Sequence, residues 1–219
     1  MIYRTEPSNW KDLQDKVAEI LNESGIFAES PKIIHSVRND YEIDVYAKEI
    51  INSRDNIILI ECKNWNTRVP QTIVHAFRTT LSDIGANVGY IISKKGFQKG
   101  AIQAAENTNI QLLTWNEFQD LFENEWRKNY LIEYIEKNWG KLMTAAEYAP
   151  ADSLISIYGW LLLELKTSPN IFYKDQPRKL PLNQYDEYQM LPEELLNETG
   201  FKEIIPLFHK YCDHLLENL

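Results

Sequence analysis

The chain has fewer basic than acidic residues, only two cysteines and no zinc-binding cysteine pattern. Each of these features excludes a class of protein. Its 23 lysines and arginines face 32 aspartates and glutamates, for a formal net charge of -9. Such a chain is not a general cationic coat for nucleic acid, although a local basic surface remains compatible with it. The two cysteines, Cys62 and Cys212, lie far apart and match no zinc-binding pattern. We therefore expect a protein of a reducing cytoplasm.

Segments that would lead the chain to a membrane are also missing. The sequence starts without the basic and apolar regions of a secretory signal, so we expect no export. The longest mostly apolar stretch, residues 154–165, is too short to span a bilayer and contains Glu164. The composition is that of an ordinary globular protein, with 44% hydrophobic and 25% charged residues over 219 positions. That length suits one large domain or two small ones.

Residues 1–127 alternate short apolar strands with amphipathic helices. Leu13, Val17 and Leu21 recur at helical spacing and predict a helix over residues 10–24, with Ser8 or Asn9 as its cap. The same criteria predict strands over 33–37, 42–47, 57–63, 87–93 and 110–115, and helices over 71–84, 97–108 and 116–126. Strands that alternate with helices indicate an α/β domain with a mostly parallel portion.

Residues 128–219 lose the strand signal. Helices are expected over 129–139 and 153–166, followed by a proline-punctuated loop over 168–192 and two further helices. Both parts are acidic, with net charges of -4 and -5, and the second shows no helix-turn-helix or zinc-finger pattern. We expect residues 128–219 to form a helical domain that binds a partner subunit or a second copy of the chain, giving a homodimer. Aromatic residues at regular spacing are expected in the core: Trp115, Trp126, Trp139, Tyr158 and Trp160.

The run ILIECKNW, residues 58–65, changes abruptly from apolar to charged. Glu61 and Lys63 are two residues apart in a strand, so their side chains point to the same face. Asp44 belongs to the preceding predicted strand, and a hairpin can bring it beside them. Two close carboxylates repel unless a cation or a proton lies between them, and oxygen ligands suit Mg²⁺ better than Zn²⁺. A lysine beside the metal can hold a water or stabilise a phosphate, so the pattern predicts phosphodiester hydrolysis.

These residues resemble the PD-(D/E)xK nuclease signature. EIDVYA followed by ILIECKNW, with GANVGYIISKKGFQKGAIQAA downstream, is most similar to the Mrr-like restriction endonucleases, with archaeal-type Holliday junction resolvases as relatives. The resemblance covers residues 10–126 and implies a restriction-endonuclease-like core, a mixed four- to five-stranded sheet flanked by helices. It also implies that Asp44, Glu61 and the backbone carbonyl of Cys62 bind Mg²⁺ or Mn²⁺, and that Lys63 serves the attacking water.

Other polar residues are candidate accessories to this site. The family carries a glutamate in its first helix, and this chain has Gln14 at that position, which leaves the number of bound metal ions open. Gln71 could reach the site from the start of the next helix. Basic residues near the strand ends are candidate phosphate contacts: Arg38, Arg68, Lys94, Lys95 and Lys99.

The resemblance implies a metal-dependent endodeoxyribonuclease that acts in restriction or anti-phage defence. Two alternatives remain open, a DNA repair or junction-resolving nuclease and a catalytically inactive subunit that binds nucleic acid or protein. An RNA substrate is a further alternative, since no residue pattern here reads a 2′-hydroxyl. Burial of Glu61 with Lys63 for stability alone is unfavourable, because desolvation roughly cancels their attraction. The pair therefore favours a catalytic site.

Overall fold

The computed structural model describes residues 1–36, 39–166, 179–217 and 219. The chain divides into an α/β unit, Glu6–Phe122, and a helical unit made of Met1–Thr5 and Glu123–Leu219. The sequence pattern placed this change of architecture after residue 127 and assigned the first five residues to the first domain. In the described part of the chain, no helix is both long enough and apolar enough to cross a membrane.

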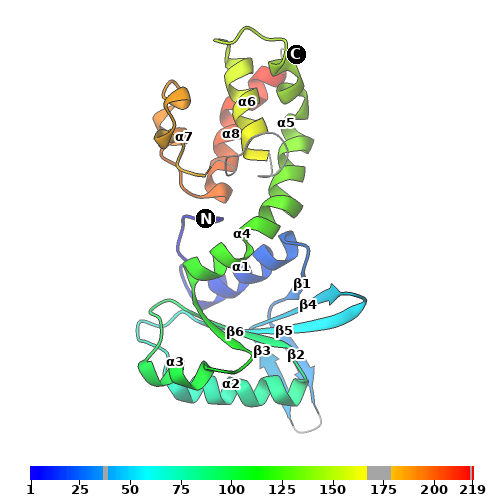
Figure 1. Ribbon diagram of the computed structural model, residues 1–219, viewed down its shortest axis with the longest axis vertical. Helices are drawn as coiled ribbons and strands as arrows, with labels where there is room; N and C mark the ends of the chain where they lie inside the picture. Colours follow the sequence, from blue (N-terminus) through cyan, green and yellow to red (C-terminus); the bar gives the residue numbers. More distant parts are fainter. Residues whose placement is uncertain (37–38, 167–178, 218) are drawn as a thin grey trace. The chain divides into compact units, whose positions relative to one another are not determined.

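The α/β unit is built on a mixed sheet of five strands in the order β1-β4-β5-β6-β7 (Figure 1). Neighbouring strands β1, β4 and β5 are antiparallel, whereas β5, β6 and β7 are parallel. This arrangement confirms the expected fold class. The strands are β1 (Phe27–Glu29), β4 (Val45–Ile51), β5 (Arg54–Lys63), β6 (Val88–Ser93) and β7 (Ile110–Thr114).

Helices cover both faces of this sheet (Figure 1). Helices α2 (Gln71–Ile84) and α3 (Lys99–Ala105) form the crossovers between the parallel strands and lie on one face. Helices α1 (Trp10–Glu23) and α4 (Trp115–Trp126) lie on the other, and α4 belongs to this unit as far as Phe122. The cover explains why β6 is buried on both of its faces.

The predicted strand over residues 42–47 is wrong in one respect, because it is interrupted at Asp44. Strand β3 (Asp40–Ile43) pairs with β2 (Lys32–His35) in a separate two-stranded sheet, whereas β4 begins at Val45 in the main sheet. Ile43 and Val45 alternate with polar residues as they would in one continuous strand. The pattern therefore could not reveal that the segments before and after Asp44 join different sheets. The break leaves Asp44 outside both ladders.

The helical unit consists of α5 (Ile132–Ala146), α6 (Leu154–Lys166), the short α7 (Glu193–Leu196) and α8 (Phe201–Leu216). A π-helical turn, Arg127–Leu131, precedes α5, and two 3₁₀ turns, Leu182–Gln184 and Asp186–Tyr188, precede α7. The predicted loop over 168–192 lies partly outside the described residues. The N-terminal segment Met1–Thr5 is fastened to α8 by Glu203, whose carboxylate accepts hydrogen bonds from the backbone N–H of Arg4 at 3.1 Å and of Thr5 at 3.0 Å.

The aromatic core is largely as predicted, with one correction. Trp115, Trp126, Trp139 and Tyr158 are buried, whereas Trp160 is 45% exposed. Helix α6, LISIYGWLLLELK, is apolar around most of its circumference. Its sequence therefore could not indicate which of its apolar residues face outward.

Gly89 in β6 lets α2 lie directly on the sheet, and this close approach yields a prediction. A Cβ at this position would lie 2.5 Å from Leu81 Cδ1 and 2.8 Å from Phe77 Cε1, inside contact distance. We expect Gly89→Ala to lower the free energy of unfolding of the α/β unit by about 1–3 kcal/mol, through overpacking. Urea denaturation followed by circular dichroism measures the loss. The control is Gly140→Ala in α5, where a Cβ meets nothing within 4 Å, and equal losses in both variants would contradict the packing argument.

Candidate functional site

Asp44 is held on both sides at the break between β3 and β4. Its Oδ2 accepts a hydrogen bond from the backbone N–H of Cys62 at 2.7 Å, and its Oδ1 accepts one from the side-chain amide of Gln14 at 2.7 Å. The first contact fastens Asp44 to β5. In the β4–β5 register Val45 pairs with Ile60, so Asp44 lies next to the position of Glu61. The structure thus brings Asp44 and Gln14 to the strand that carries Glu61 and Lys63.

Glu61 and Lys63 form an ion pair on one face of β5, between Oε1 and Nζ. Their side chains are 26% and 16% exposed, so the pair is partly withdrawn from water. Burial raises the pKa of Glu61 above its ordinary value, the Lys63 ammonium opposes this shift, and the Asp44 carboxylate adds to it. A cation between the two carboxylates would offset both the energetic cost of burying the Glu61 carboxylate and its repulsion by Asp44.

Cys62 separates these two residues and points the other way. Its side chain is buried, as predicted, and burial raises the pKa of its thiol well above the ordinary value. A thiol with a raised pKa carries little thiolate and is a poor nucleophile. What Cys62 offers the site is therefore its backbone, whose N–H already contacts Asp44.

Gln14 provides the observation that tests whether a metal ion suits this site. The side chain is 4% exposed, and its Oε1 has no hydrogen-bond partner among the described residues. An unsatisfied buried polar group costs about 1–3 kcal/mol, and a cation bound to this oxygen would remove that cost. Two carboxylates and an amide oxygen form a donor set that hard cations such as Mg²⁺ and Mn²⁺ prefer. The residues therefore fit such an ion.

The two carboxylates would need help from backbone oxygens or water to hold it. In the ranges that the structure describes, no group of three or more His, Cys, Asp or Glu side chains is gathered as a metal site. The third member of the predicted ligand set is the backbone carbonyl of Cys62 rather than a side chain, and this ligand set stays a prediction.

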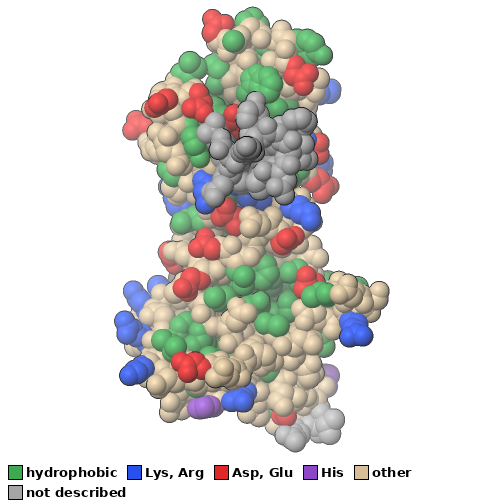
Figure 2. Space-filling model, viewed as in Figure 1, with side chains coloured by type: hydrophobic (Ala, Val, Ile, Leu, Met, Phe, Trp, Pro, Cys, Tyr) green, Lys and Arg blue, Asp and Glu red, His purple; other side chains and the backbone are tan. Residues whose placement is uncertain are grey.

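The loops that follow β5 and β6 are joined around Val69. Its N–H donates to the carbonyl of Gly96 at 3.0 Å, and its own carbonyl accepts from the N–H of Gln98 at 3.0 Å. The N–H of Lys94 donates to the carbonyl of Lys63 at 3.1 Å, which ties the second loop to the site. Figure 2 shows basic side chains along the edge of the α/β unit at which α3 lies. The exposed basic residues on these loops and at the start of α3 are Arg68, Lys94, Lys95 and Lys99.

Two other predicted accessory residues, Gln71 and Arg38, are not shown to contact the site. Gln71 lies against α3, where its Oε1 would be 2.7 Å from a Cβ on Gly100. Arg38 lies outside the described residues. Sequence reasoning missed Trp65, which lies two residues beyond Lys63 and past the end of β5, and Lys63 Nζ lies 5.4 Å from the centroid of its ring.

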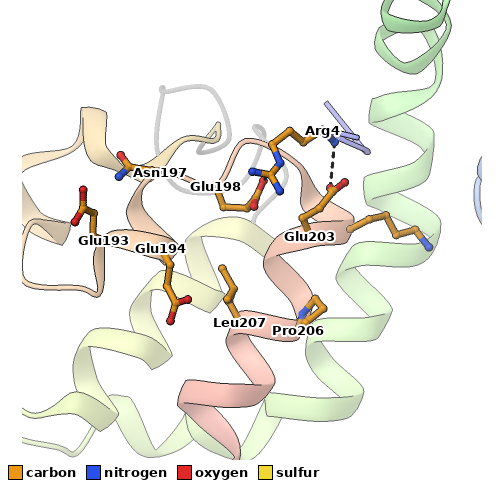
Figure 3. A pocket seen from close by; sticks show the side chains of 9 residues that line it. Arg4, Glu193, Glu194, Asn197, Glu198, Glu203, Pro206 and Leu207 are labelled. Atoms are coloured by element: carbon orange, nitrogen blue, oxygen red, sulfur yellow. Dashed lines mark hydrogen bonds and ion pairs between the residues drawn. The ribbon is translucent and has the colours of Figure 1, made fainter. Parts of the chain in front are cut away.

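A second feature of the molecule is a pocket of about 820 Å³ in the helical unit, lined by the N-terminal segment, α7 and α8 (Figure 3). Two of its carboxylates, those of Glu198 and Glu203, contact Arg4 of the N-terminal segment. The Glu198 carboxylate accepts a hydrogen bond from the N–H of Gly200 at 2.9 Å and pairs with Arg4 at 3.4 Å, and Glu203 accepts from the backbone of Arg4. These contacts hold the N-terminal segment in place, which is a structural task.

Comparison with known proteins gives one family match. Residues 6–122, more than half of the chain, match the family model Mrr_cat, described as restriction endonuclease. No curated protein matches the chain.

Solved structures give weaker similarities. One is a protein of unknown function, AF1548, at 24% identity and a TM-score of 0.43, over 49% of this chain and 59% of that one. Another is protein VC1899 from Vibrio cholerae, at 17% and 0.41, over 54% and 33%. The third is the MspJI restriction endonuclease in complex with a 27-mer oligonucleotide, at 14% and 0.33, over 54% and 27%. The chain thus spans between 27% and 59% of the length of these structures.

Proposed function

We propose a function from one premise, that this chain belongs to the Mrr-like restriction endonuclease family through residues 6–122. The proposed function is that of an endonuclease that hydrolyses DNA with a bound Mg²⁺ or Mn²⁺. The observation that carries the proposal is the hydrogen bond from Cys62 N–H to Asp44, which fastens one carboxylate beside the strand of the Glu61–Lys63 pair. Family membership supports a nuclease. The metal, the DNA substrate and a role in restriction or anti-phage defence belong to the proposal.

The proposed roles follow from the contacts of each group. Asp44, Glu61 and the backbone carbonyl of Cys62 would hold the metal, with Gln14 Oε1 as a further oxygen. When bound, such an ion polarises the scissile phosphate and lowers the pKa of a coordinated water. Lys63, beside Glu61, would orient the attacking water and balance negative charge on the phosphate. The amide of Gln14 keeps the Asp44 carboxylate in position.

The test is the nicking and linearisation of supercoiled plasmid by the full chain with Mg²⁺, Mn²⁺ or EDTA. We expect cleavage with either metal and none with EDTA. Cleavage that persists in EDTA would remove the metal from the proposal, and no cleavage of plasmid, linear or branched DNA with either metal would reject the enzyme. Faster cleavage of branched than of linear DNA would favour the repair or junction-resolving nuclease over the restriction role.

The second candidate is an inactive nuclease-like subunit that binds nucleic acid or protein. Gln14 favours it, because an amide brings no charge to a position where the family carries a glutamate. Calorimetry with Mg²⁺ and Mn²⁺ separates the two functions, because an enzyme of this design must bind the ion. A site that binds neither metal supports the inactive subunit.

We also propose that the helical unit binds a second copy of the chain or a partner subunit. Six of its large apolar side chains are exposed in the described part of the chain: Met1, Tyr148, Leu154, Trp160, Met190 and Leu219. Size-exclusion chromatography with light scattering tests self-association. A strict monomer would leave only the partner subunit.

The basic residues on the two loops yield a prediction about salt. Lysines that contact phosphates release counterions, and each contact adds about 0.9 to the slope of log affinity against log salt on duplex DNA. We expect the triple variant Lys94→Gln, Lys95→Gln, Lys99→Gln to bind DNA more weakly and to lose up to about three from this slope. Fluorescence anisotropy across a salt series measures it. The matched control replaces three exposed lysines of the helical unit, Lys128, Lys137 and Lys141, by glutamine. An equal change of the salt slope in this control would reject specific phosphate contacts by Lys94, Lys95 and Lys99.

A further inference from the structure

Two tryptophans of the α/β unit remain in contact with solvent, and each lies next to a member of the candidate site. Trp65 is 40% exposed and Trp10 is 62% exposed, whereas Trp115 of the same unit is buried. Single exposed apolar side chains are common on protein surfaces. Two of the largest apolar side chains beside one polar site form a more specific arrangement, since an indole combines a broad flat face with little conformational freedom.

Trp65 borders the lysine of the site. It follows Lys63 by two residues just beyond the end of β5, and Lys63 Nζ lies 5.4 Å from the ring centroid. This distance is within the range of cation–π contacts, which extends to about 6 Å. A nucleotide whose phosphate is held at Lys63 therefore has the indole of Trp65 as an immediate neighbour.

Trp10 continues the buried face of α1 past the end of the core. It lies four residues before Gln14, on the same side of the helix as Gln14, Val17 and Leu21, which are all buried. Helical side chains point toward the N-terminus of their helix, so the ring of Trp10 projects one turn beyond Gln14. Gln14 in turn contacts Asp44. Trp10 thus has the helical phase of the core but is exposed, one helical turn before the glutamine that contacts Asp44.

We propose that Trp65 and Trp10 stack on unstacked bases of the DNA strand in the site, so that the substrate is DNA with unpaired bases at the scissile position. The inference rests on the proposed nuclease function. Aromatic platforms beside a basic track are the arrangement that binds single strands, and Arg68, Lys94, Lys95 and Lys99 supply such a track. Bases inside an intact duplex present only their edges, which offer an indole no face to stack on. The unpaired base can come from a single strand or be displaced locally from a duplex.

The test measures binding in EDTA, so that cleavage plays no part in it. Fluorescein-labelled 20-mers are offered to the full chain as a single strand, as a duplex and as a duplex with a central unpaired bubble. We expect at least one of the two unpaired forms to bind about tenfold or more tighter than the duplex. Trp65→Ala and Trp10→Ala should each weaken that binding by about five- to a hundredfold and leave duplex binding unchanged. Trp65→Phe should keep most of the affinity, because a phenyl ring still stacks.

The control is Trp160→Ala, which removes a tryptophan of similar exposure, 45%, from the helical unit. Equal losses in Trp65→Ala and Trp160→Ala, or equal affinity for the duplex and both unpaired forms, would overturn the inference. Preference for the bubble over the single strand assigns the base to a distorted duplex, and the reverse assigns it to a free strand. Tighter binding of RNA of the same sequence would overturn the assignment to DNA. Stacking that depends on Trp65 in a chain that cleaves no DNA would reject the nuclease function alone.

Discussion

Asp44→Asn is expected to lower metal-dependent DNA cleavage at least about a hundredfold without unfolding the protein. The asparagine oxygen can still accept the hydrogen bond from Cys62 N–H, so the link between the β3–β4 break and β5 survives. What the variant loses is the negative charge that a divalent cation needs. Residues that merely support a metal ligand cost 10- to 100-fold when they are replaced, so the loss of a ligand itself should cost at least as much. Initial rates of plasmid nicking under saturating Mg²⁺ measure the effect.

Lys63→Ala is expected to distinguish metal binding from activation of the attacking water. Removal of the ammonium leaves Asp44 and Glu61 in place and lowers the positive charge beside them, so Mg²⁺ binding by calorimetry should persist or tighten. Cleavage should nevertheless fall by about 10²- to 10⁴-fold, the usual contribution of a positioned acid–base group. The matched control is Asp55→Asn at the opposite end of β5, where the carboxylate pairs with Lys48 at 2.8 Å and lies far along the strand from Glu61. If Asp44→Asn and Lys63→Ala lower the melting temperature yet cleave like the control, the site is structural.

Elements whose information is local were predictable from the sequence. Helix α2 spans Gln71–Ile84 as predicted, because Val74, Phe77 and Leu81 repeat at helical spacing between two residues that stop a helix. Pro70 precedes the helix, and Gly85 ends it with a φ of 74°, a conformation that glycine adopts without strain. The strand that carries Glu61 and Lys63 was equally clear, since an apolar run before a charged pair specifies both the element and the shared face.

Elements that depend on tertiary structure were not predictable in the same way. The break at Asp44 arises because β3 and β4 pair with different strands, and nothing within residues 42–47 records that choice. The hydrogen bond between Gln14 and Asp44 joins residues 30 positions apart, so the family resemblance could suggest Gln14 as an accessory but could not show its contact. Strand β1 has only three residues, too few for any periodicity.

The N-terminal segment is the clearest case. Thr5 Oγ1 donates to Glu203 at 2.8 Å across 198 residues of sequence, and no pattern in Met1–Thr5 announces that partner. The family model also begins only at residue 6, where the α/β unit begins. The first five residues thus belong structurally to the helical unit, and their removal would alter that unit rather than the candidate site.

Trp139→Ala is expected to lower the free energy of unfolding of the helical unit by about 3–5 kcal/mol, the usual cost of truncating a buried tryptophan. The indole of Trp139 is fully buried, and its ring centroid lies 5.7 Å from that of Phe208 and 4.9 Å from that of His209 on α8. Its Nε1 also donates to Asp213 at 3.0 Å, so the variant loses a hydrogen bond as well as packing. Urea denaturation followed by circular dichroism measures the loss.

Trp160→Ala provides the matched control for that prediction, because it removes the same side chain from the neighbouring helix α6 at a position that is 45% exposed. A surface substitution of this kind should change the free energy of unfolding by no more than about 0.5 kcal/mol. A loss at Trp160 comparable to that at Trp139 would mean that α6 presents this residue to a packed interface, such as a second copy of the chain. The loss would then depend on protein concentration, whereas the loss at Trp139 would not, because its partners all lie within the same helical unit.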